Sequence, residues 1–113
     1  MESRRAWIDR CLSLPNTYED YPFEDDNWTV LRHRGNRRTF VFLFERRGNL
    51  WLNLKCEPMR AAFYREIYPA VLPAYHLNKT HWNSVVLDGT VPDEEVWEMV
   101  CQSYDLTKPK KAL

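Results

Sequence analysis

The residues between Thr39 and Lys55 read TFVFLFERRGNLWLNLK, which is two apolar runs around a short polar break. Both runs are rich in aromatic and aliphatic residues, as strands are, and the Arg-Arg-Gly-Asn between them suits a turn. We therefore predict a β-hairpin with strands over 39–45 and 49–55 and an arginine-bearing tip.

The two predicted strands differ in how their side chains alternate. In strand 49–55, three leucines occupy one face while Trp51, Asn53 and Lys55 occupy the other. This alternation is typical of a strand with only one covered face. Strand 39–45 is apolar on both faces, so we predict that it is central in the sheet.

The rest of the chain supplies both strands and helices around this hairpin. A second arginine-bearing turn, 34–37, joins strand 39–45 to another strand before it. The predicted elements are a helix over 3–14, strands over 28–33, 39–45 and 49–55, a helix opened by Glu57-Pro58 and ended before Pro69, strands over 71–77 and 83–88, and a last helix after a capping sequence at 90–93.

This order, α-β-β-β-α-β-β-α, predicts an α+β two-layer sandwich with an antiparallel-rich sheet and helices on one face. The acidic residues before Asp26 are predicted to form a connection. One core is expected, to which Trp7, Phe63 and Trp97 contribute. The second helix is expected to face it with Met59, Ala62, Phe63 and Ile67.

Length and composition are those of one globular domain. The chain has 113 residues, of which 44% are hydrophobic and 28% charged. We predict a single domain over 1–107 and a frayed basic tail over 108–113. No apolar run approaches the ~20 residues that span a bilayer, and none follows the N-terminus as in a secretory signal. A cytoplasmic protein without membrane contact is expected.

Three widely separated cysteines, Cys11, Cys56 and Cys101, lie beside apolar residues. We predict that they are buried and unpaired, as in a reducing compartment. They are spaced equally, but their flanking residues share nothing, so the spacing does not indicate a repeat.

Charge is unevenly distributed although the formal net charge is zero. Between Arg32 and Lys79 there are ten basic residues and three acidic ones, a net charge of +7. Five acids lie in 19–26 and six in 88–105. The molecule is therefore predicted to be electrostatically two-sided, while its zero net charge argues against strong nucleic-acid binding.

Further stretches carry a family resemblance. Residues 75–83 read YHLNKTHWN and residues 87–94 read LDGTVPDE, with LKCEP at 54–58 and Ser103-Tyr104 near the end. These resemble the pattern of the MmcQ/YjbR family along essentially the whole chain. The resemblance implies a small α+β fold described as secretion-chaperone-like. It also implies DNA binding, by analogy with a double-wing domain that grips DNA with its sheet and hairpins. Thr80 departs from the pattern, since many relatives have a second basic residue there.

The arginine-bearing hairpin tips favour nucleic-acid binding. Guanidinium groups pair bidentately with phosphate, and hairpin wings can reach a duplex groove. Because no recognition helix is evident, the predicted binding is weak and largely independent of DNA sequence. The alternative is ordinary charged turns that face water and keep edge strands from aggregating. The residues predicted to contact phosphate are Arg34, Arg37, Arg38, Arg46, Arg47, Lys55 and Lys79.

Aromatic residues lie among these cations. Trp51, Asn53 and Lys55, with Trp28 and Arg32 on a neighbouring strand, would offer stacking platforms for unpaired bases if they were exposed. The other interpretation, which we favour, is a second sheet face that is partly covered.

The motif at 75–83 has the densest polar chemistry of the chain. Its two histidines could join a metal or acid-base site, but no second cluster supplies further ligands, so we expect no metal and no cofactor. We interpret the motif as a strand connection whose side chains hydrogen-bond the backbone and hold Trp82 on the core, with Asn78 and Lys79 still able to contact a ligand. Its residues of interest are His76, Asn78, Lys79, His81, Trp82 and Asn83.

Catalysis is not expected, because the chain has no nucleophile elbow, phosphate-binding glycine loop or paired-cysteine motif. The acids in 19–26 could collect cations, although a solvated loop is the simpler interpretation. Two functions remain open. The first is a DNA-binding module, and the second is a protein- or peptide-interaction domain that dimerises or holds a peptide along its sheet.

Overall fold

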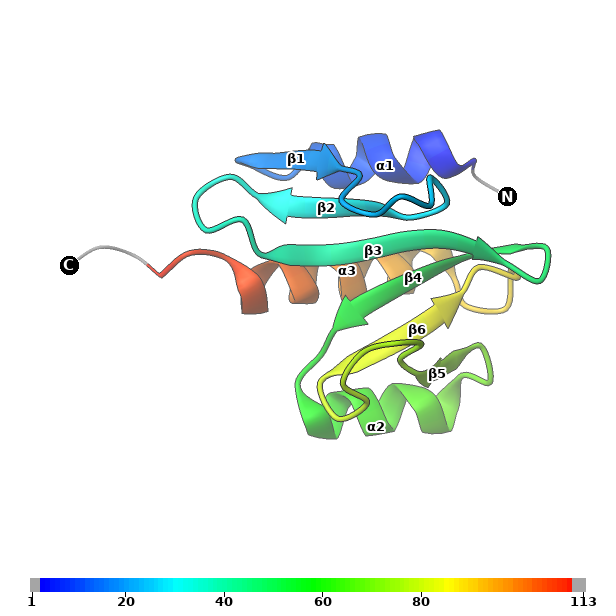
Figure 1. The fold of residues 1–113 in the computed structure, drawn as a ribbon. Coiled ribbons are helices and arrows are strands. Elements are labelled where there is room, and N and C mark those ends of the chain that lie inside the picture. Colours follow the sequence, from blue (N-terminus) through cyan, green and yellow to red (C-terminus); the bar gives the residue numbers. More distant parts are fainter. Residues whose placement is uncertain (1–2, 111–113) are drawn as a thin grey trace.

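A six-stranded antiparallel sheet with the strand order β1-β2-β3-β4-β6-β5 organises the chain (Figure 1). The structure is a computed structural model that describes residues 3–110. It confirms the predicted α+β class and the central position of β3. The elements are α1 (Arg4–Leu12), β1 (Thr17–Asp20), β2 (Thr29–His33), β3 (Thr39–Arg46), β4 (Asn49–Lys55), α2 (Pro58–Ile67), β5 (Val71–Pro73), β6 (Trp82–Val86) and α3 (Asp93–Thr107).

Strand β1 lies in the acidic segment that the sequence predicts as a connection, so the predicted order lacks one strand. It pairs antiparallel with β2, and its acids find cations on both sides. The Nε of Arg32 lies 2.9 Å from a carboxylate oxygen of Asp20, and Arg5 of α1 lies 2.7 Å from Glu19. An acidic strand is stable here because neighbouring elements supply the opposite charge, which local propensity does not reveal.

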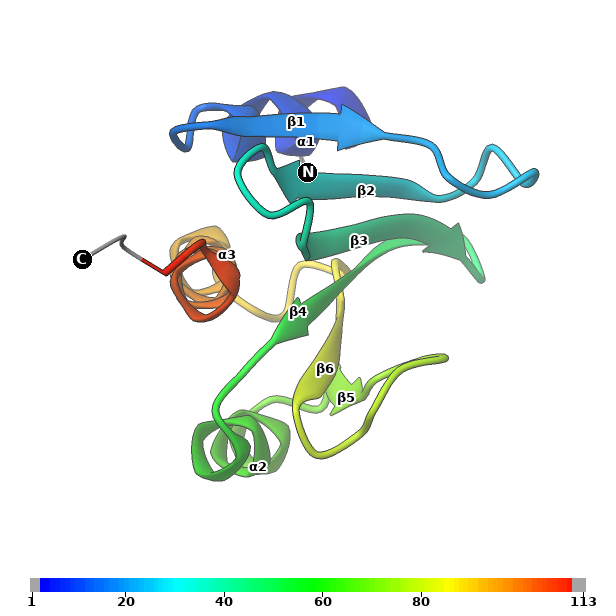
Figure 2. The same cartoon turned by 60° about the vertical axis from the view of Figure 1, so that its left-hand side comes forward.

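All three helices contribute to one core on one face of the sheet, as predicted. In Figure 2, α2 and α3 lie to the left of the sheet, on the side opposite the long loops. Trp7 is 1% exposed and lies at the centre of the contacts of α1, while Trp97 is partly buried against the same cluster.

The prediction for the inner face of α2 is wrong. The helix buries Ala61 and Tyr64, and it turns Met59, Phe63 and Ile67 to the solvent. Both sides of this helix are apolar enough to be buried, so helical spacing could not choose between them. Polar contacts decide the choice: the side chain of Asn83 donates to the carbonyl of Ala61, and Gln102 donates to the hydroxyl of Tyr64.

Helix α3 is held to the sheet by two buried polar contacts. The hydroxyl of Ser103 donates to the carbonyl of Phe40 at 2.6 Å and accepts from the amide of Lys55 at 2.9 Å, so it bridges β3 and β4. Near the end of the helix, His33 Nε2 lies 2.9 Å from the hydroxyl of Thr107. Residues 108–110, part of the predicted tail, are neither helix nor strand, and Pro109 lies against Gly35. Residues 111–113 lie outside the described range.

Burial of His33 predicts a pH dependence of stability. Desolvation lowers the pKa of His33 in the folded protein, so the unfolded chain takes up this proton at a higher pH than the native one does. The free energy of unfolding should therefore fall as the pH drops below about 6.5, the ordinary value of histidine. Urea denaturation between pH 5 and 8 should show this loss for the wild type and a flatter profile for His33→Gln. An equal slope in both proteins would contradict the prediction.

The tip of the β3–β4 hairpin has a strained arginine. Arg47 and Gly48 form a two-residue connection with φ of 52° and 81°, as a type I′ turn requires. Asparagine and glycine tolerate the first position, whereas arginine is disfavoured there. We expect Arg47→Asn to raise the free energy of unfolding by about 0.5–1 kcal/mol, measured by urea denaturation. Arg46→Asn at the neighbouring strand position should give no such gain, and a destabilised Arg47→Asn would refute the explanation.

Candidate functional site

The sheet face opposite the helices is covered by two loops, 21–28 and 74–81, which project to the right of the sheet in Figure 2. Trp51 is only 7% exposed and Asn53 is fully buried. The prediction that β4 has only one covered face is therefore wrong. The alternative of an exposed aromatic and basic surface for stacking unpaired bases is also wrong. The favoured prediction of a partly covered second face is confirmed.

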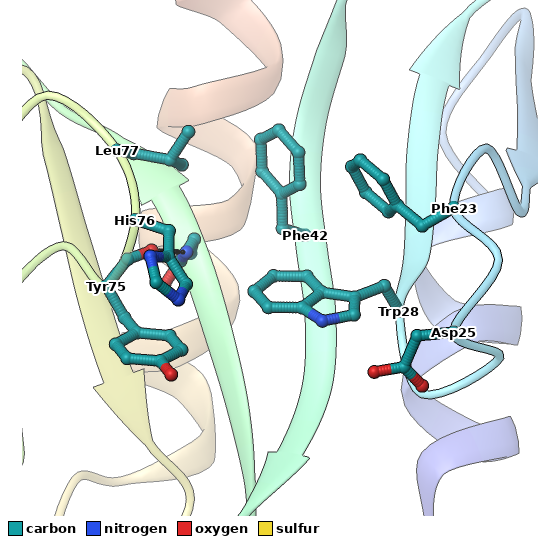
Figure 3. Close-up of a pocket in the computed structure, with 8 residues that line it drawn as sticks. Phe23, Asp25, Trp28, Phe42, Tyr75, His76 and Leu77 are labelled. Atoms are coloured by element: carbon teal, nitrogen blue, oxygen red, sulfur yellow. Dashed lines mark hydrogen bonds between the residues drawn. The ribbon is translucent and has the colours of Figure 1, made fainter.

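A cleft of about 370 Å³ lies between these loops (Figure 3). Its floor comes from the sheet and its walls from both loops, and four of its eight lining residues are Phe, Trp or Tyr. The size is at the lower end of the range for small-ligand sites. The lining residues are Phe23, Asp25, Trp28, Phe42, Asn53, Tyr75, His76 and Leu77.

Trp28 is the central ring of the cleft. One of its faces stacks on Phe44, with the centroids 4.1 Å apart and the planes 20° apart. Phe23 and Phe42 stand nearly perpendicular to it, at 72° and 82°, with centroids 6.1 and 6.5 Å away. The face of Trp28 that does not stack on Phe44 is thus the one available to a ligand, and two rings of a different orientation border the same space (Figure 3).

A buried side-chain network fixes the second wall. Asn53 on β4 donates from its amide to the carbonyl of Tyr75 at 2.9 Å and accepts from the hydroxyl of Ser84 on β6. The same hydroxyl accepts from the backbone amide of Tyr75 at 2.8 Å. Both polar groups of the Tyr75 backbone are therefore held by side chains of the sheet, which positions its ring at the cleft.

The polar residues of the 75–83 motif mostly build their own loop, as its structural interpretation expected. Asn78 accepts with its side chain from the amides of Thr80 and His81, and the ammonium of Lys79 donates to the carbonyl of Ala74 at 2.6 Å. Trp82 is half-buried and lies nearly perpendicular to Phe42, outside the core cluster, so the prediction that the motif holds Trp82 on the core is wrong. Three residues of the motif, Tyr75, His76 and Leu77, line the cleft, and the backbone of His76 is left-handed with φ of 64°.

Loop 21–28 is anchored by Asn27, whose side chain exchanges two hydrogen bonds of 2.9 Å with the backbone of Glu45. The guanidinium of Arg4 also bonds Asn27 and Thr29. Asp25 accepts from the amide of Asn27 at 2.9 Å. The carboxylates of Glu24, Asp25 and Asp26 are exposed along this loop, beside the cleft.

The five hairpin arginines do not form one surface. Arg34, Arg37 and Arg38 precede β3, whereas Arg46 ends it and Arg47 follows it, so the two groups lie at opposite ends of the sheet (Figure 1). The length of the eight-residue strand β3 separates them, a distance of roughly 25 Å. Of the predicted lysines, Lys55 ends β4 and Lys79 lies in loop 74–81.

Arg46 is half-buried, with its guanidinium 4.5 Å above the ring of Tyr75 and 5.0 Å above that of Trp51. It therefore belongs to the aromatic cluster more than to a phosphate-facing surface. The sequence signals this cluster only weakly, because the aromatic residues of the two loops come from segments about fifty residues apart.

The thiols are not arranged for chemistry. The three cysteines are free, as predicted, but only Cys11 and Cys56 are buried, and Cys101 is partly exposed. Burial raises the pKa of Cys11 to about 12 and also raises the pKa of Cys56 and Cys101, which keeps them protonated and unreactive. Within residues 3–110, no group of three or more histidine, cysteine or acidic side chains is placed to hold a metal ion. No helix in this range is long and apolar enough to cross a membrane.

Fold and site together define a small α+β domain with three helices on one face of a six-stranded antiparallel sheet and an aromatic cleft on the other. The family model described as YjbR matches residues 12–106. The chain belongs to the YjbR family, as the resemblance of its motifs predicted.

Relatives of known sequence and structure agree with this assignment. The Bacillus subtilis protein YyaQ is 35% identical over 103 residues, which cover 81% of this chain and 86% of YyaQ. The Escherichia coli protein YjbR is 29% identical over 94 residues, or 83% of this chain and 77% of its own. A crystal structure from Deinococcus radiodurans matches with a TM-score of 0.83 and 34% identity, covering 94% of this chain and 78% of that one. One from Pseudomonas syringae has the same TM-score at 28% identity, covering 94% and 99%.

Proposed function

We propose that this chain is a protein-interaction domain without catalysis, which receives one side chain of a partner protein in the aromatic cleft. The cleft itself is the observation that supports this proposal. Four aromatic rings and Leu77 line a space of about 370 Å³ that is open to solvent. A buried network holds one wall, and exposed hydrogen bonds of Asn27 to the backbone of Glu45 anchor the other, so the site is formed before a partner arrives, which lowers the entropic cost of binding.

The chemistry of the lining supports binding more than catalysis. Its ionisable groups are Asp25, His76 and the Tyr75 phenol, and it has no serine, cysteine or lysine to serve as a nucleophile. Asp25 is exposed, and one of its carboxylate oxygens accepts a hydrogen bond from the backbone amide of Asn27. A site of this kind can orient an apolar or cationic group without transforming it.

The test is an NMR titration of the full chain with short peptides that vary in one central side chain. A peptide that enters the cleft should shift the indole signal of Trp28 and the methyl signals of Leu77. Leu77→Trp should fill the cleft and abolish the shift of the Trp28 indole, whereas Leu72→Trp, at an exposed leucine on β5, should leave that shift unchanged. Binding that survives Leu77→Trp would place the ligand elsewhere.

DNA binding remains a second candidate, supported by the surface at the β2–β3 end. Arg34, Arg37 and Arg38 are exposed there, and Lys108 and Lys110 line the same depression as Arg34. Arg37 has a φ of 61°, a conformation in which glycine or asparagine is preferred, so turn chemistry does not explain its presence. The opposite end is less suited to phosphate, because the acids of loop 21–28 and Glu45 lie beside Arg46 and Arg47.

This division makes the DNA hypothesis more specific. Changing Arg34, Arg37 and Arg38 together to alanine should weaken binding to random duplex DNA and reduce the log-log salt slope by up to about 2.7, since each lost phosphate contact removes about 0.9. Changing Arg46 and Arg47 should have much less effect. Mobility shifts and fluorescence anisotropy at several salt concentrations measure both. Equal losses in the two variants would argue for a surface that spans the sheet, and a wild type that binds no DNA at low salt would remove this candidate.

A further inference from the structure

We propose that the side chain received by the cleft is a methylated lysine of the partner protein. This inference rests on the proposed function and specifies the chemical class of the ligand. It follows from the orientation of the rings, the charge of Asp25 in the lining and the largely apolar character of the rest of the cleft.

The rings have the arrangement that favours an organic cation. A cation near the face of an aromatic ring is attracted by its π electrons, tryptophan being the strongest partner. The free face of Trp28 borders the cleft, and Phe23 and Phe42 stand at 72° and 82° to it. Tyr75, the fourth ring of the lining, is nearly parallel to Trp28, with the planes 6° apart and the centroids 6.5 Å apart. The lining therefore combines parallel and perpendicular rings, and rings in more than one orientation suit a roughly spherical group such as a methylated ammonium better than a flat one.

The same aromatic cluster already holds a cation within the chain. The guanidinium of Arg46 lies 4.5 Å from the ring centre of Tyr75 and 5.0 Å from that of Trp51. These distances are within the range of favourable cation–π contacts. Arg46 therefore shows that the environment accepts positive charge next to aromatic surface.

The charges around the cleft also favour a cation. Asp25 lines the cleft, and Glu24 and Asp26 flank it on the same loop. Two positive groups lie nearby: Arg46, over Tyr75 and Trp51, and Lys79, whose ammonium is turned to the carbonyl of Ala74. His76 lines the wall opposite Asp25 (Figure 3). Arg47, next to Arg46, is a third basic residue in this region, so the carboxylates of the loop do not outnumber the cations. The preference for a cation comes from Asp25, which alone among these charged residues lines the space itself.

Methylation is inferred from the hydrogen bonds that the lining can offer. An unmodified ammonium has three N–H donors, and burying them without acceptors is costly. The Asn53 oxygen already accepts from Ser84, and one oxygen of Asp25 accepts from Asn27. The acceptors left in the lining are the second Asp25 oxygen on one wall and the Tyr75 hydroxyl and His76 ring on the other, while the rest of the surface is apolar. A trimethylammonium group has no N–H to satisfy and covers the rings with methyl groups instead. The remaining volume of the cleft accommodates the alkyl chain behind the cation.

The experiment compares four probes by NMR titration of the full chain, following the Trp28 indole signal. They are a short peptide with trimethyllysine at its centre, the same peptide with a tert-butyl group in place of the trimethylammonium, the peptide with unmodified lysine, and choline. The trimethyllysine peptide should bind about five- to thirty-fold more tightly than its neutral isostere, the range set by partly to fully desolvated cation–π contacts. It should also bind more tightly than the unmodified peptide and choline.

Asp25→Asn tests the electrostatic contribution of Asp25 to cation binding in the cleft. Asparagine can still accept from the amide of Asn27 and preserve the loop, while the charge is removed. The preference for the cation over its isostere should shrink several-fold, and Asp26→Asn, which alters the same loop outside the lining, should retain most of it.

The outcomes separate the two proposals. Equal binding of the charged peptide and its neutral isostere would overturn the cation inference and leave the cleft as a side-chain site. Choline binding as tightly as the peptide would overturn a protein source. A Trp28 signal that none of these four probes moves would overturn the methyllysine inference, and if peptides with aromatic and aliphatic side chains also fail to move it, the proposed function fails as well.

Discussion

Replacing Trp7 by alanine is expected to lower the free energy of unfolding by about 3–5 kcal/mol, the usual cost of removing a large buried aromatic side chain. Trp7 is 1% exposed and packs in the core with Ile8 and Cys11 of the same helix. Its loss would open a cavity between α1 and the sheet that the surrounding strands cannot close. Urea denaturation measures the change. If Trp7→Ala does not fold, Trp7→Phe should give a smaller loss of the same sign.

Phe63→Ala is the matched comparison, because the sequence predicts both side chains in the core. Phe63 is 57% exposed on the outer side of α2, so its replacement should change the free energy of unfolding by no more than about 0.5–1 kcal/mol. A similar large loss in both variants would mean that α2 buries the face predicted from its spacing and not the face with Ala61 and Tyr64.

Asn53→Ala is expected to cost about 2–4 kcal/mol, because it removes two buried hydrogen bonds and leaves polar groups of Tyr75 and Ser84 without partners. The effect should also reach the site. Without the bond to its carbonyl, the Tyr75 backbone is held only through its amide, so the hydrogen of that amide should exchange with solvent faster. Peptide binding in the cleft, the binding that Leu77→Trp abolishes, should also weaken.

The matched variant for this prediction is Asn49→Ala, a half-buried asparagine at the start of the same strand, which should cost much less. A double-mutant cycle with Ser84→Ala measures the coupling within the network, which should be clearly non-additive because both residues hold the same backbone group. A loss below about 1 kcal/mol with unchanged exchange at Tyr75 would show that the network does not position the loop.

Regular periodicity of apolar residues in the sequence determined much of the fold of this protein. The strands β3 and β4 agree with the sequence prediction to within one residue, because their apolar patterns are long and the turn between them is chemically distinct. The three helices, their common core and the central place of β3 were predicted for the same reason. The family was evident in the 75–83 motif, and the predicted hydrogen bonds of its side chains to the loop backbone are present at Asn78 and Lys79.

The tertiary structure alone decided the rest, and in each case the reason is a contact between segments distant in the chain. Strand β1 is acidic and is stabilised by cations from β2 and α1. Helix α2 has two apolar sides, and Asn83 and Gln102 select the one that is buried. The two groups of hairpin arginines are close in sequence, but the eight-residue strand β3 places them at opposite ends of the sheet. The cleft exists because loops 21–28 and 74–81 converge over β3 and β4, and neither loop has a periodic pattern from which its fold, or its meeting with the other, could be predicted.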